Sequence, residues 1–301
     1  MKHFLLNITQ IKLPFGIALL LLCGVCWVRS IMAEPLLTSV TMSLAVVNAV
    51  LLMRLCYKTN MTRTMSFMPV VMYMLPFSAL PWLHQCWQGQ VACMALLLSD
   101  IQLLGTYRMD NAAGEALLST LLILAGSLFC AEMIFIVPLL WVFFMVQQSF
   151  NLKVFISSLI AVAVVVIYAG IVLWLQPELP RISPVTALTG RELLPLPQGI
   201  LVIVMVVTVL TFLVFALLNF SQENVTTQTY ITFSGIPLLA IITFTVWQSA
   251  GHGALCLLLL TLAMLATHFF LYKQTLPRGI TFIAYLLVFF SYHILLATNI
   301  L

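Results

Sequence analysis

Long, continuous apolar segments follow one another along almost the whole chain of 301 residues, with short polar connections between them. A helix needs about 20 apolar residues to cross about 30 Å of hydrocarbon. The segments are continuous rather than alternating, which excludes a transmembrane β-barrel. Because unpaired backbone groups are costly in lipid, the segments must be helices. The sequence therefore predicts an all-α, polytopic transmembrane protein whose apolar helices contact the lipid bilayer.

Composition supports the same class. The chain is 63% hydrophobic and only 7% charged, with a mean hydropathy of +1.17, whereas a soluble domain carries about 25% charged residues. No basic patch with interleaved aromatic residues indicates nucleic-acid binding. The seven cysteines show no metal-ligand spacing, so neither a metal site nor a cofactor is predicted. Cys23 and Cys26 form a CxxC inside an apolar run, where we expect small packing residues rather than a redox pair.

About eleven membrane segments are predicted within a single integral membrane domain that covers residues 1–301. The longest extramembrane loop, at residues 176–198, is expected on the outer side, and the first apolar segment is interpreted as a retained helix. The segments are Leu13–Ala33, Leu36–Cys56, Met65–Trp82, Val91–Thr106, Ala112–Ala131, Met133–Gln148, Val154–Leu175, Gly199–Asn219, Tyr230–Gln248, Gly253–Tyr272 and Gly279–Thr298.

One acid, Glu132, interrupts the apolar run from Leu117 to Val146. As a single helix this run would be about 45 Å long, too long for one crossing without strong tilt. If Arg108 and Lys153 both face the cytoplasm, the chain crosses twice between them and Glu132 lies at the far turn. The segment FCAEM contains no Gly, Pro or Asn to make that turn, so a short or re-entrant hairpin is the alternative.

The basic residues favour an inward N-terminus and an outward C-terminus, since cytoplasmic loops carry an excess of Lys and Arg. Nine of the twelve fall on the predicted inner side and three on the outer side. The inner residues are Lys2, Lys12, Arg54, Lys58, Arg63, Arg108, Lys153, Lys273 and Arg278, and the outer ones are Arg29, Arg181 and Arg191.

Most of the other polar residues gather at the predicted outer rim. The ordinary interpretation is loop solvation with surface ion pairs, each contributing about 0–1 kcal/mol. A carboxylate beside an apolar helix end is costly unless it is paired, which makes the acids at such ends functional candidates. The outer candidates are Arg29, Glu34, His84, Glu132, Arg181, Arg191, His252 and His293.

Asp100 lies within the fourth predicted segment and is the most buried acid expected in the chain. Tyr107 is placed on the same helix face and Arg108 lies beside it. Asn48 and His268 are alternative partners, and the sequence does not choose among them. Prolines at 69, 76, 81 and 138 and the Gly235-Ile236-Pro237 segment predict broken helices, which can mark a transporter site.

The passages LLLSDIQLLGTYRMDNAAGEALLSTLLILAGSLFCAEMIFIVPLLWVFFM and NLKVFISSLIAVAVVVIYAGIVLWL, within residues 96–175, resemble an uncharacterised family of multipass inner-membrane proteins of Bacteroidota. This resemblance implies a bacterial inner-membrane location and no activity. The inward N-terminus, the acid Glu34 in the first outer turn, the outer arginines and the central hairpin are similar to C-class polyprenyl-phosphate-dependent membrane glycosyltransferases. In that family the first outer loop is long, whereas here only a few residues join the first two segments.

Two functional hypotheses follow. In the first, an enzyme acts at the outer face on a polyprenyl-linked lipid. Glu34 or Glu132 is the general base, arginines 29, 181 and 191 hold a phosphate, and histidines 84, 252 and 293 contact the substrate. In the second, the protein is a transporter built on Asp100 or a structural subunit with membrane-protein partners in an envelope complex. A lateral groove near Glu34 and Glu132 favours the enzyme, and a central cavity lined by Asp100 favours transport.

Overall fold

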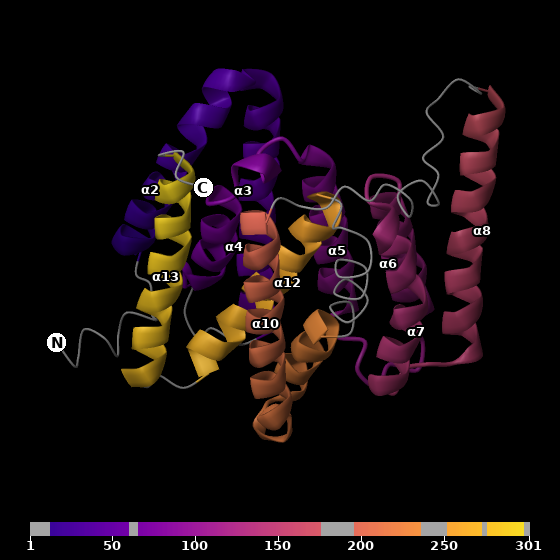
Figure 1. Ribbon diagram of the computed structural model, residues 1–301. Coiled ribbons are helices and arrows are strands. Elements are labelled where there is room, and N and C mark those ends of the chain that lie inside the picture. Colours follow the sequence, from indigo (N-terminus) through magenta and orange to yellow (C-terminus); the bar gives the residue numbers. More distant parts are fainter. Residues whose placement is uncertain (1–12, 60–65, 176–195, 236–251, 273–275, 298–301) are drawn as a thin grey trace.

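The computed structural model describes residues 13–59, 66–175, 196–235, 252–272 and 276–297, and this part of the chain is helical with no strand, as the sequence predicts (Figure 1). A further helical stretch covers 225–235. The α-helices are α2 (Leu13–Ala33), α3 (Pro35–Lys58), α4 (Met68–Ser78), α5 (Trp87–Leu103), α6 (Ala113–Ser127), α7 (Ile136–Val146), α8 (Leu152–Leu175), α10 (Leu196–Leu218), α12 (His252–Tyr272) and α13 (Leu276–Ala297), and the 3₁₀ turns are η1 (Pro81–Leu83), η2 (Ala131–Phe135) and η3 (Phe220–Gln222).

Within the described residues, four helices are long and apolar enough to cross a membrane. On α8 the apolar side chains of Val166, Ile167 and Trp174 are more than half exposed. A helix that is hydrophobic on all sides and still exposes large apolar residues is stable against lipid rather than water. These features are those of a membrane protein. The four spans are Gly16–Ala33, Pro35–Lys58, Leu152–Val172 and Gly253–Tyr272.

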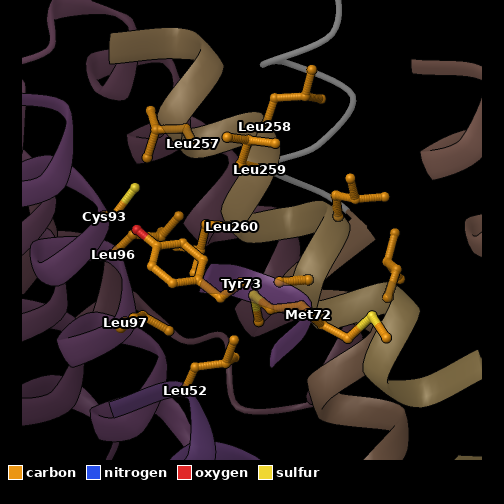
Figure 2. Close-up of a cluster of buried hydrophobic side chains, with 14 of the residues drawn as sticks. Leu52, Met72, Tyr73, Cys93, Leu96, Leu97, Leu257, Leu258, Leu259 and Leu260 are labelled. Carbon is orange, nitrogen blue, oxygen red and sulfur yellow. The ribbon is translucent and has the colours of Figure 1, made fainter. Parts of the chain in front are cut away.

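Helix α12 forms the centre of the fold and packs against α4, α5 and α10. Every residue of α4 is buried as well. Figure 2 shows Tyr73 of α4 lying among Leu96 of α5 and Leu260 of α12, with its hydroxyl toward Cys93. Because α4 carries no charge and α12 carries only histidines, both can pack in the interior without an unpaired ion.

The predicted turn at Glu132 is present, and the single long helix is excluded. Helix α6 ends at Ser127, the backbone is extended at Cys130, and η2 leads into α7. At the other end of this hairpin the Arg108 amide donates to the Gln147 carbonyl at 2.9 Å. Residues 128–135 contain no Gly, Pro or Asn, so an extended residue followed by a 3₁₀ turn supplies the change of direction. Met133 of this turn packs on Gly126 at the end of α6, where a β-carbon would not fit.

The end of the hairpin opposite Glu132, here called the Arg108 end, also gathers other elements. The Asn151 side chain, just before α8, donates to the Asp110 carbonyl at 2.9 Å. The hydroxyls of Thr226 and Thr227 donate to the Thr59 carbonyl after α3, at 3.4 and 3.3 Å. The ends of α3 and α7 and the starts of α6, α8 and 225–235 thus lie on one side of the molecule.

Candidate functional site

Asp100 lies in the last turn of α5, which ends at Leu103, and is only 2% exposed. Both carboxyl oxygens are buried and have no hydrogen-bond partner within the described residues. The C-terminal end of a helix carries partial negative charge, so α5 itself does not stabilise a carboxylate at this position. The predicted burial of Asp100 is confirmed, and its carboxyl group is held there without compensation.

The Asp100 carboxyl faces a narrow internal gap between α3, α5, α12 and the helical residues 225–235. The gap has no room for a water molecule. An ordered water needs both volume and polar partners, so the carboxyl is dry in this conformation. The other lining residues are Leu55, Leu104, Thr229, Tyr230, Phe233 and Met264.

Two hydroxyl groups connect the gap to other polar atoms. The Tyr230 hydroxyl donates to the Met264 carbonyl at 3.1 Å and lies 3.5 Å from the Cys56 sulfur. The Thr229 hydroxyl lies 3.0 Å from Oε1 of Gln147, whose backbone carbonyl accepts from Arg108. The Thr229 hydroxyl also lies 2.9 Å from the Val225 carbonyl of its own helix, and Gln147 joins Thr229 to the backbone of the exposed Arg108.

Arg108 is not the partner of Asp100, contrary to the sequence prediction. Its Nε donates to Oε1 of Gln148 at 2.9 Å, and its guanidinium lies 5.1 Å from the centroid of the Tyr107 ring. The prediction is wrong because α5 stops at Leu103, so the helical face does not continue to these residues. In addition, Gly105 has a φ of +106° and turns the chain before it reaches these residues.

The two alternative partners also bind elsewhere. Asn48 donates to the Gln90 carbonyl at 2.9 Å and to Gln90 Oε1 at 2.8 Å, and Tyr73 donates to the same Oε1 at 2.6 Å. The sequence analysis missed Gln90, although a glutamine inside an apolar segment is a signal of this kind. His268 Nε2 lies 3.2 Å from Oε1 of Glu223, the one ion pair among the described side chains.

The structure does not bring the outer acids and Arg29 into one site. Glu34 is exposed at the turn between α2 and α3 and does not cap α3 with its side chain. Arg29 is exposed as well. Glu132 is half-buried, and its Oε2 accepts a hydrogen bond from the Cys130 thiol at 3.0 Å. No ion pair joins these three residues in the described part of the chain.

His84 is a packing residue rather than an exposed ligand. Its ring is fully buried and stacks on Trp27 with centroids 3.9 Å apart. Nδ1 lies 2.8 Å from the Ser30 hydroxyl and Nε2 lies 3.2 Å from the Ser78 carbonyl. The remaining outer candidates, Arg181, Arg191 and the side chains of His252 and His293, lie outside the described residues.

Comparisons with known proteins give no match to any family model, curated protein or solved structure. No group of three or more His, Cys, Asp or Glu residues in the described ranges could hold a metal ion. The Asp100 gap is the candidate site with the clearest geometry, because it places a buried, unpartnered acid between four packed helical segments.

Proposed function

We propose that this chain is a multipass inner-membrane protein that moves protons, with Asp100 as the group that carries them. The observation that carries this proposal is the buried carboxyl group with no partner among the described residues. A buried acid that makes neither an ion pair nor a hydrogen bond lowers the stability of the fold, because no favourable interaction offsets the loss of its hydration. Ionisable groups inside membrane proteins are accordingly functional candidates.

The size of the gap selects the proton over larger cations. The space beside Asp100 does not hold even a water molecule, so a sodium or potassium ion with its oxygen ligands does not fit in this conformation. A proton needs no added volume, because it binds directly to a carboxyl oxygen. Thr229 and Gln147 then supply hydrogen-bonding groups between the gap and the Arg108 end, which is the cytoplasmic end in the proposed topology.

Movement of a proton to the other face needs a second conformation in which the gap opens away from the Arg108 end. Helix α4 contains Pro76, and Pro237 follows the helical residues 225–235 in the sequence. Proline removes a backbone hydrogen bond and weakens a helix locally. The segment 225–235 lines the gap directly, and α4 packs on α12, so a change in either one alters the walls of the gap.

Proton flux into liposomes tests this function. The purified full-length protein is reconstituted with a pH-sensitive dye inside, and a potassium diffusion potential drives protons inward. We expect flux with the native protein, flux close to that of empty liposomes with Asp100→Asn, and native flux with Asp110→Asn, which changes an exposed acid at the Arg108 end. Native protein that conducts no better than empty liposomes, or an unaffected Asp100→Asn variant, would refute the proposal.

A second candidate function is the enzyme acting on a polyprenyl-linked lipid, and a groove on the surface favours it. The groove lies between α10 and α13 over α12, with a volume of about 310 Å³. The hydroxyls of Thr208 and Thr211 are bound to carbonyls of their own helix, so the wall is effectively apolar and suits an isoprenoid chain. Glu34 and Glu132 do not line it.

A photoreactive polyprenyl phosphate tests this second candidate. Ala284 lines the groove, and Ala284→Trp fills it, so we expect less cross-linking to α10 and α13 in this variant. Val214, on α10, is 55% exposed and does not line the groove, so Val214→Trp is the matched control. Equal labelling of both variants would exclude the groove as the binding site of the lipid chain.

A further inference from the structure

Cys86 and Cys256 come from distant parts of the chain and meet over the backbone of one glycine. A β-carbon placed on Gly89 would lie 2.7 Å from the Cys256 sulfur and 3.0 Å from the Cys86 sulfur. Both sulfur atoms therefore lie beside the Gly89 backbone at the start of α5. A residue with a β-carbon at position 89 would collide with them, since real β-carbons do not approach other atoms so closely.

The two thiols also influence each other electrostatically. The neighbouring Cys256 thiol holds the pKa of Cys86 below its ordinary value in spite of burial, and the Gly89 amide adds to the same effect. Cys86 immediately precedes the first residue of α5, where the helix terminus favours a thiolate. Cys86 is partly exposed, whereas Cys256 is fully buried.

We infer that Cys86 and Cys256 are a thiol pair that closes reversibly into a disulfide joining α5 to α12. In the first step the Cys86 thiolate attacks a disulfide of an oxidant, forms a mixed disulfide and releases one thiol of the oxidant. In the second step the Cys256 thiol attacks the Cys86 sulfur, and its proton passes to the departing thiolate, which leaves as the second thiol. The two cysteines lose two electrons in total, and the oxidant is reduced to two thiols.

Cys93 and Cys130 also lie near Cys256, but neither has the partial exposure of Cys86. Cys130, near the same helix ends, donates its thiol hydrogen to Glu132, and Cys93 is fully buried further along α5. Cys23 and Cys26 both lie on α2, and Cys26 donates to the carbonyl of Leu22 in its own helix. Of the seven free cysteines, Cys86 therefore combines partial exposure with a thiol partner from another helix.

The pair lies at the start of α5, and Asp100 lies in the last turn of the same helix. In the proposed topology the thiols are at the outer end, where oxidising conditions favour disulfides. The thiol pair rests on its own geometry and does not depend on proton movement by Asp100.

Thiol mapping of the folded, full-length protein in detergent tests the inference. The protein is incubated with glutathione disulfide, blocked with a maleimide after denaturation, and analysed by intact mass and non-reducing peptide mapping. We expect the native protein to lose two thiols, to gain no glutathione and to yield one linked peptide pair containing Cys86 and Cys256. Cys23→Ser should give the same linked pair.

The single variants separate the two roles. Cys256→Ser should retain one glutathione on Cys86, because no second thiol displaces it, and Cys86→Ser should lose no thiol. A linked pair with any other cysteine, or seven free thiols in native protein after oxidation, would overturn the inference. A linked Cys86–Cys256 pair that appears only after unfolding would overturn it as well. All of these outcomes are measured on the native protein, so they do not depend on whether a variant folds.

Discussion

His84 and Asp100 are both buried polar side chains, but only His84 has hydrogen-bonding partners, and this difference indicates different roles. His84 has hydrogen-bonding groups at both ring nitrogens and an aromatic ring stacked on it, whereas both oxygens of Asp100 are without a partner in the described chain. Nearly all buried polar groups in native proteins are satisfied. Burial alone therefore does not mark function, and an unsatisfied ionisable group is the more specific signal.

Replacement of His84 should lower stability and nothing more. His84→Ala removes the stacking on Trp27 and leaves the Ser30 hydroxyl without its partner, so we expect a loss of about 1–3 kcal/mol in the free energy of unfolding. Gln85→Ala, at an exposed neighbour, should change it by less than about 0.5 kcal/mol. Thermal unfolding in detergent measures both, and equal melting temperatures would contradict the packing role.

Gly89 should tolerate no side chain. Gly89→Ala forces its new methyl group against Cys256, and overpacking of this kind costs about 1–3 kcal/mol. Gly24→Ala, on α2, meets no atom within 4 Å, so it should be neutral or stabilising, because alanine favours a helix over glycine. Melting temperatures of the two variants provide the comparison, and a stable Gly89→Ala variant would show that α5 and α12 are less closely packed.

At the scale of elements, α8 and α12 show how similar helices come to occupy different places. Both are more than 20 residues long and strongly apolar. Most of α12 is buried by α4, α5 and α10, whereas α8 packs mainly on α6 and exposes much of its surface. In Figure 1, α8 stands at the edge of the molecule and α12 within it. The difference arises from packing partners and not from hydropathy.

The hairpin of α6 and α7 makes the position of Glu132 testable. In a background without the native cysteines, Glu132→Cys should react with a membrane-impermeant thiol reagent added from outside, because the residue is at a turn and partly exposed. Ile160→Cys, at an exposed position within α8, should be protected by lipid. Equal protection of the two positions would contradict an outer turn and favour a re-entrant hairpin.

For the whole molecule, the proposed topology has an inward N-terminus and an outward C-terminus. Nine inner and three outer basic residues support it, and so does the reversal between Arg108 and Lys153. Reporter fusions after Lys58, Lys153 and Leu301 should read inside, inside and outside. A cytoplasmic signal from the fusion after Leu301 would show that the number of crossings is even.

The sequence alone was sufficient for the properties set by length and polarity. The all-helical class, the bounds of α2 and the hairpin at Glu132 follow from the length of apolar segments and the positions of charges, because lipid restricts both. Asp100 was identified as the most buried acid for the same reason.

Only the tertiary structure decided which polar groups meet. Asn48 bonds to Gln90, Cys86 and Cys256 meet beside Gly89, and Asp100 has neither Arg108 nor any other partner in the described residues. These contacts join residues that are far apart in sequence or depend on where a helix stops, as α5 does at Leu103. In lipid, no hydrophobic force favours one apolar helix face over another, so the detailed fit of side chains decides which helices pack together. Hydropathy carries no information about that fit.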